Sequence, residues 1–133
     1  MNNQKIIQLQ NQEFVLNLSD EDEYYKIEAF ANDCAVACMT FKLKRGTCYL
    51  NRIEILDPKY SHIGLGTQIL KFMEQISYKA NCCSVEGKFY PFGELGKHAK
   101  DFYLKNGYEI YKEYYETYIS KYLTKTNIME ETL

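Results

Sequence analysis

Residues 52–74 read RIEILDPKYSHIGLGTQILKFME, and the hydrophobic period changes in the middle of this stretch. Before Asp57-Pro58, apolar residues occupy both parities of the run 47–56, which is typical of a strand covered on both faces. After the two glycines, apolar residues recur at steps of three and four, which predicts an amphipathic helix over 65–80. The stretch therefore indicates a central strand, a proline turn and a helix that begins beside Gly64 and Gly66.

The flanking segments extend this pattern to the whole chain. Upstream, β-rich runs are separated by turn residues, and they cover 13–19, 24–31, 35–44 and 47–56. Downstream, we expect a strand over 82–90, a loop over 91–96, a helix over 97–107, two strands within 108–123 and a frayed tail over 124–133. The order predicts a single α+β domain over 1–133, with a mixed, mostly antiparallel central sheet and helices packed on its faces.

Composition excludes several classes of function. The 133 residues carry a formal net charge of −2, so no overall positive field favours nucleic acid or an anionic membrane. The N-terminus resembles no signal peptide and no run reaches membrane-spanning length, so we expect a cytoplasmic protein. Five cysteines lack zinc-binding spacing, so we expect no metal site and interpret them as buried free thiols. Thirteen tyrosines, many of them within 108–122, make a homodimer through these strands possible.

The glycines at the predicted helix entry permit two interpretations. The first amides of a helix have no intrahelical acceptor and lie at the positive end of its dipole, so they can bind phosphate oxygens. A tight turn that needs glycine for its own geometry explains Gly64 and Gly66 equally well. Neither common glycine-rich phosphate motif is present, because Ile69 replaces the last glycine of GxGxxG and no Gly-Lys-Thr/Ser follows.

A wider pattern resembles the GNAT superfamily of N-acetyltransferases. The stretch 52–74 is similar to the family's acetyl-CoA-binding segment, in which a strand and a Pro-x-Tyr turn precede Arg/Gln-x-x-Gly-x-Gly/Ala and a helix. Residues 99–108, AKDFYLKNGY, are similar to its Ala-x-x-Phe-Tyr-x-x-x-Gly-Phe helix end. Ser61 stands where the family usually has Arg or Gln, and the helices that the family often places after its first strand are reduced here.

The resemblance implies an enzyme that transfers an acetyl group from acetyl-CoA to a primary amine of a small molecule or peptide. It implies that Tyr103 protonates the departing sulfur, although this ring could simply pack, and that the Leu56 amide polarises the thioester carbonyl. Glu54 is a candidate general base or a structural partner of Arg52, and Glu86 is a second candidate. The residues expected to bind the cofactor are Ile55, Leu56, Ser61, His62, Ile63, Gly64, Leu65, Gly66 and Thr67. The alternative is a GNAT-like module that binds coenzyme A or a partner protein without turnover.

Overall fold

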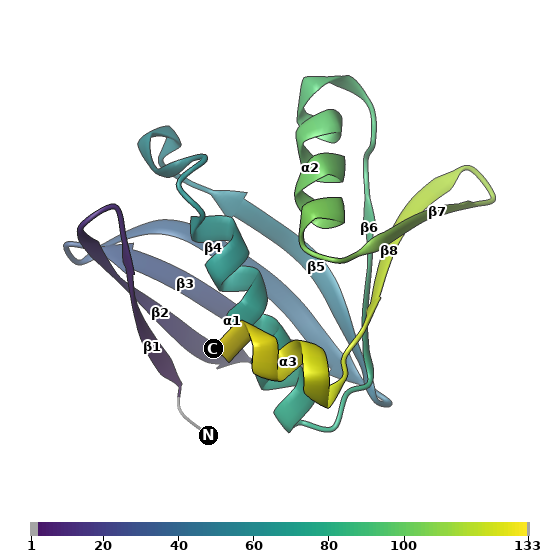
Figure 1. Ribbon diagram of the computed structural model, residues 1–133, viewed down its shortest axis with the longest axis horizontal. Coiled ribbons are helices and arrows are strands. Elements are labelled where there is room, and N and C mark those ends of the chain that lie inside the picture. The colour runs from purple at the N-terminus through teal and green to yellow at the C-terminus, as the bar shows by residue number, and fades with distance from the viewer. Residues whose placement is uncertain (1–2, 133) are drawn as a thin grey trace.

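The computed structural model describes residues 3–132, which form one eight-stranded mixed sheet and three α-helices (Figure 1). The strands are β1 Gln4–Leu9, β2 Gln12–Glu21, β3 Tyr24–Ala31, β4 Cys34–Lys44, β5 Thr47–Ile55, β6 Ser84–Phe89, β7 Glu109–Glu113 and β8 Glu116–Tyr122. The helices are α1 Leu65–Lys79, α2 Gly93–Lys105 and α3 Lys125–Thr132, and a 3₁₀ turn covers Pro58–Tyr60. The predicted α+β class and mixed sheet are confirmed.

The first five strands form an antiparallel meander in sequence order. Its β3–β4 and β4–β5 hairpins turn through Asn32-Asp33 and Arg45-Gly46, and all four residues have positive φ, as tight two-residue hairpins require. The turn chemistry read from the sequence is therefore confirmed. Strand β1 was not predicted, because residues 4–9 mix polar and apolar side chains without a clear alternation.

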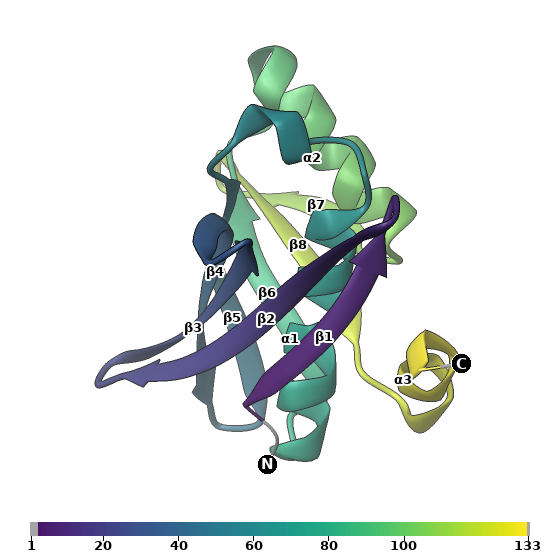
Figure 2. The ribbon, with the colours of Figure 1, turned by 90° about the vertical axis from the view of Figure 1, so that its left-hand side faces the viewer.

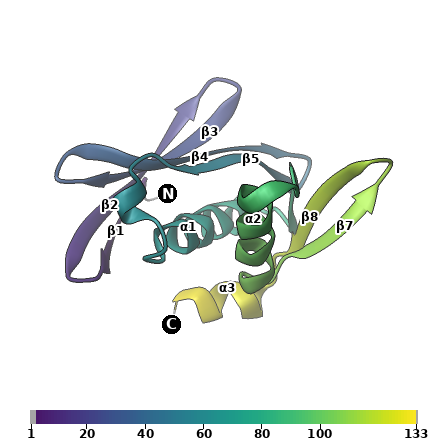
Figure 3. The same cartoon turned by 90° about the horizontal axis from the view of Figure 1, so that it is seen from above.

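The helices pack against the sheet, as expected. Figure 3 shows the sheet curving around α1, α2 and α3, and Figure 2 shows the β1–β2 hairpin passing over α1. Phe14, Ile27, Met39 and Phe41 point from the strands into the core beneath α1, and all are fully buried. None of the helices within residues 3–132 is long and apolar enough to cross a membrane.

Three local features differ from the sequence-based expectations. Helix α2 begins at Gly93, inside the expected loop, because Gly96 lets its first turn pack against the Pro91 backbone.

Residues 125–132 form α3 rather than a frayed tail, since Thr124 and Asn127 cap each other's backbone amides and Ile128 is buried. The cysteines are free as expected, but Cys34 and Cys83 are exposed rather than buried.

Strands β5 and β6 run parallel, and their pairing is short. It covers Thr47–Leu50 opposite Ser84–Gly87 and then ends, so the two strands diverge beneath α2 (Figure 1). Gly87 stands at this fork, where an added Cβ would lie 2.9 Å from the Leu50 carbonyl oxygen and 3.3 Å from Ile119 Cγ1. The fork therefore depends on a residue without a side chain at position 87.

We expect Gly87→Ala to lower the free energy of unfolding by about 1–3 kcal/mol, because the methyl group would press on a backbone carbonyl that cannot move aside. Chemical denaturation monitored by circular dichroism measures this change. Ser84→Ala, on the same strand but away from the fork, is the control and should change stability by less than about 0.5 kcal/mol. Equal stabilities of the two variants would contradict the tight contact at the fork.

Candidate functional site

The open edge of β5 beyond the fork forms the first part of the site. A bulge between Thr40 and Phe41 in the β4–β5 register places Asn51 as an extra residue on β5. Beyond it, the Leu56 amide donates to the Val36 carbonyl oxygen at 2.8 Å, which fixes the direction of the alternating amides. Alternation then points the amides of Ile53 and Ile55 toward the edge where pairing with β6 has ended.

This geometry corrects one predicted role. The Leu56 amide was expected to polarise a thioester carbonyl, but its hydrogen already serves the β4–β5 ladder. Ile55, which was predicted to bind the cofactor, has its amide on the open side. The amide of Ile53, a residue that was not predicted, faces the same side. The sequence carries no sign of the bulge, and a single extra residue reverses which amides face the gap.

The N-terminus of α1 forms the second part of the site, and it begins next to the end of β5 (Figure 1). Its N-cap is Gly64, which adopts the left-handed conformation (φ 94°), and no side chain caps the helix. Serine, threonine or aspartate at this position would commonly cover the first amides. Here the amides of Leu65, Gly66 and Thr67 remain uncovered by a capping side chain and carry the positive end of the helix dipole. Such a cradle fits a phosphate group.

Gly66 has a structural explanation. An added Cβ would lie 3.3 Å from Phe102 Cε1, so this glycine allows α2 to pack against the first turn of α1. The same interface contains a hydrogen bond of 3.3 Å between the Asn106 side chain and the Thr67 hydroxyl. Gly64 therefore serves the turn and Gly66 the helix packing. The amides of Leu65, Gly66 and Thr67 form the cradle in addition to these structural roles.

The other loop residues expected to bind the cofactor lie around this helix end. His62 is exposed and has a positive φ of 62°, and its ring lies 6.0 Å from that of His98 on α2. Ser61 and Ile63 are half-buried, and Leu65 is buried in the core. Leu65 can therefore contribute only its backbone, whereas Ser61 and His62 present polar side chains near the cradle.

Tyr103 lies on α2 in an aromatic cluster. Its ring contacts Phe89 at the end of β6 and Tyr108 before β7, with centroid distances of 5.6 and 5.7 Å. Burial raises the pKa of the Tyr103 phenol to about 12, so the hydroxyl keeps its proton at neutral pH. Within the described part of the chain, this hydroxyl makes no hydrogen bond. Gln75 Nε2 is the one fully buried side-chain atom there that lacks a hydrogen-bond partner, so the Tyr103 oxygen must be partly accessible. Tyr103 thus combines a packed ring with an unused proton donor.

Tyr108 provides a useful contrast. Its hydroxyl donates to the buried Glu74 carboxylate at 2.6 Å, and Lys121 Nζ lies 3.1 Å from the same carboxylate. Burial and the neighbouring Glu74 charge raise the pKa of Tyr108 well above its ordinary value. This second tyrosine is therefore fully engaged inside the fold.

The two candidate bases, Glu54 and Glu86, lie in different parts of the sheet. Glu54 forms an ion pair of 2.7 Å with Arg52, as the structural alternative proposed, and its side chain is 40% exposed. Glu86 lies between Tyr49 and Ser120, where β5, β6 and β8 are still paired. Of the two, only Glu54 lies within the open segment of β5. Among the side chains of residues 3–128, no group of three or more metal-ligating side chains is arranged to hold an ion.

A cavity of about 530 Å³ opens at the fork. It is lined by Leu50 and Asn51 of β5, by the end of β6 with the following loop 90–92, and by the β7–β8 turn with Glu116 and Thr117. Tyr90, Phe92 and Tyr115 line it as exposed aromatic side chains, and Lys88 and Glu116 pair at 2.9 Å. Asn51 reaches this lining because the bulge makes it an extra residue on β5.

Neither any protein-family model nor any curated protein sequence matches the chain. Similar solved structures exist, however. The PaiA N-acetyltransferase of Thermoplasma acidophilum, in complex with coenzyme A, aligns with a TM-score of 0.65 and 20% identity over 73% of this chain and 59% of that one. A GNAT-family acetyltransferase of Desulfovibrio desulfuricans gives a TM-score of 0.69 and 16% identity over 77% and 70% of the two chains.

The ribosomal-protein-S18-alanine N-acetyltransferase of Escherichia coli aligns with a TM-score of 0.64 and 18% identity, over 79% of this chain and 72% of that one. This chain therefore spans well under the full length of these neighbours. Structural similarity of this extent at identities of 16% to 20% shows a shared fold. The chain has the fold of the GNAT-type N-acetyltransferases.

Proposed function

We propose that the protein is an acetyl-CoA-dependent N-acetyltransferase that acts on a primary amine of a small molecule or peptide. The observation that carries this proposal is the placement of two unused sets of backbone amides side by side. One set is the uncapped first turn of α1, and the other is the open edge of β5 at Ile53 and Ile55. The similarity to acetyltransferases, one of them in complex with coenzyme A, supports the same reading.

The residues present fit this cofactor. The amides of Leu65, Gly66 and Thr67 would hold the diphosphate, with Ser61 and His62 as side-chain donors beside them. The amides of Ile53 and Ile55 would bind the extended pantetheine arm along the edge of β5, as an added strand is bound. When bound, acetyl-CoA supplies an acetyl group activated as a thioester.

The chain's own groups then provide three kinds of assistance. An amide on the open edge of β5 would donate to the oxygen of the acetyl carbonyl as negative charge develops there. The Tyr103 hydroxyl would give its proton to the sulfur when the carbon–sulfur bond breaks. The proton lost by the amine would pass to water or to Glu54, whose carboxylate is wetted. The cavity at the fork, with its aromatic lining, is the proposed place of the acceptor amine.

Ligand binding and turnover test this proposal separately. Thermal unfolding with acetyl-CoA at a concentration well above its Kd should raise Tm by several degrees. Incubation with acetyl-CoA and a panel of amines should then give acetylated product, which is best measured by mass spectrometry, because the exposed Cys34 and Cys83 would react with thiol reagents. Binding without product for any amine would favour the non-catalytic module, and absence of binding would contradict the proposal.

The assembly state is a further part of the proposal. Strand β7 forms one edge of the sheet, and Tyr114 and Tyr115 at its turn are almost fully exposed. These features support the homodimer through the tail strands that the sequence suggested. Light scattering after gel filtration would give the mass of a dimer if the contact forms in solution.

A further inference from the structure

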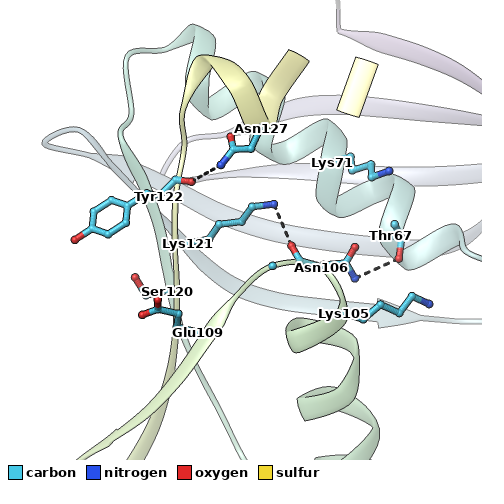
Figure 4. A pocket seen from close by; sticks show the side chains of 10 residues that line it. Thr67, Lys71, Lys105, Asn106, Glu109, Ser120, Lys121, Tyr122 and Asn127 are labelled. Atoms are coloured by element: carbon cyan, nitrogen blue, oxygen red, sulfur yellow. Dashed lines mark hydrogen bonds between the residues drawn. The ribbon is translucent and has the colours of Figure 1, made fainter. Parts of the chain in front are cut away.

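A second cavity, of about 720 Å³, lies on the helical side of the sheet (Figure 4). It is an open cavity lined by residues of α1, the end of α2, the β7–β8 pair and the beginning of α3. Thr67, Lys71 and Lys105 lie on one side in Figure 4, and Glu109, Ser120 and Tyr122 lie on the other. The cavity therefore has one wall that belongs to the helix whose first turn forms the phosphate cradle.

The wall of this cavity next to α2 carries an excess of positive charge. Lys121 also lines it, but its ammonium bonds both Glu74 oxygens at 3.1 Å and the Asn106 carbonyl oxygen at 3.0 Å, so Glu74 cancels its charge. Lys71 and Lys105 form no ion pair with any carboxylate among the side chains that the structure describes, those of residues 3–128. Glu109 is the carboxylate that lines the opposite wall. The wall next to α2 thus presents two cations that nothing in this part of the chain neutralises.

The two cations stand at a defined distance from the cradle. Lys71 follows Thr67 by four residues on α1, so it lies on the same side about 6 Å further along the helix axis. The Asn106–Thr67 hydrogen bond holds the end of α2 against this turn, which places Lys105 next to it. A ligand with one phosphate group on the first turn of α1 and another about one helical turn away would therefore meet both lysines.

We propose that Lys71 and Lys105 bind the 3′-phosphate of coenzyme A. This proposal rests on the proposed function, which places the diphosphate on the amides of α1. Coenzyme A carries its third phosphate on the ribose next to that diphosphate, so the nucleotide end would extend from the cradle into this cavity. The lysines supply long, flexible cations suited to a phosphate monoester.

Dephospho-coenzyme A, which lacks only the 3′-phosphate, gives a direct test by calorimetry. The unmodified protein should bind coenzyme A at least about tenfold more tightly than dephospho-coenzyme A, as expected for charge-assisted contacts to one phosphate. The double variant Lys71→Ala/Lys105→Ala should lose this preference while its affinity for dephospho-coenzyme A stays unchanged. Lys79→Ala/Lys112→Ala, which removes two exposed lysines outside the cavity, is the matched control and should keep the preference.

The outcomes separate the two proposals. Equal affinities of the unmodified protein for the two ligands, or a preference that survives in the cavity variant, would overturn the role of Lys71 and Lys105 and leave the proposed function intact. Failure of both ligands to bind would overturn the proposed function and this inference with it. A loss of preference in both double variants would show a general charge effect and would also overturn the assignment to this cavity.

Discussion

Replacing Tyr103 with phenylalanine should lower kcat for acetyl transfer by about a hundredfold or more, the usual contribution of a positioned general acid. The variant keeps the ring and its contacts with Phe89 and Tyr108, so folding and coenzyme A binding should be preserved. Only the proton donor is removed. Steady-state kinetics with saturating amine, combined with calorimetry of coenzyme A binding, measures the two quantities separately. Unchanged turnover would show that Tyr103 has only a packing role.

Tyr108→Phe is the matched control for this prediction. It also removes one phenolic hydroxyl from the same cluster, but this hydroxyl bonds the buried Glu74 carboxylate at 2.6 Å. We expect the free energy of unfolding to fall by about 1.5–3 kcal/mol, as for a lost hydrogen bond to a charged group, with kcat little changed. The two substitutions should therefore have different effects: Tyr103→Phe should lower turnover, whereas Tyr108→Phe should lower stability.

The raised pKa of Tyr103 adds a test that depends on pH. A general acid must be protonated to act, and its contribution is lost as pH rises through its pKa. Because the pKa of Tyr103 is about 12, turnover should remain level through the alkaline range in which an ordinary phenol, with a pKa of about 10, already loses its proton. A fall in kcat centred near the ordinary phenol pKa would contradict the buried position of this acid.

Gly64→Asp should weaken coenzyme A binding by about a hundredfold, because a carboxylate beside the first amides of α1 would repel the diphosphate at close range. Aspartate adopts the left-handed conformation more readily than most residues, and the nearest atom to a Cβ at this position is Leu9 Cδ2 at 3.9 Å. A side chain therefore has room, and the backbone strain of a Cβ at φ 94° is shared with the control variant Gly64→Asn. Gly64→Asn has the same shape without the charge and should weaken binding much less. Calorimetry and thermal unfolding of both variants would measure these effects, and equal affinities would contradict an anion site at this helix end.

Much of the fold was predictable because the chain's apolar periods are regular. Strand β3 and helix α1 match their predicted ranges almost residue for residue, since alternation and steps of three and four are both unambiguous there. Helix α3 was missed because its sequence, KTNIMEET, is short and mostly polar and shows no apolar period. The reciprocal cap between Thr124 and Asn127 was the sequence signal that could have revealed it.

The site was less predictable, for a reason that depends on single residues. The extra residue Asn51 on β5 reverses the direction of the amides beyond it, and nothing in the local sequence marks this bulge. The contact between Gly66 and Phe102 joins helices that are separated by a strand in the sequence, and so does the cavity wall formed by Lys71 and Lys105. Such features depend on tertiary packing, and a one-dimensional pattern carries no record of them.

Titration of ¹⁵N-labelled protein with coenzyme A, monitored through the backbone amide signals, tests the central claim most directly. We predict the largest shifts at Leu65, Gly66 and Thr67, accompanied by shifts at Ile53 and Ile55, because these amides would gain phosphate or pantetheine acceptors. Saturable shifts confined to other surfaces, with these five amides unmoved, would contradict the account.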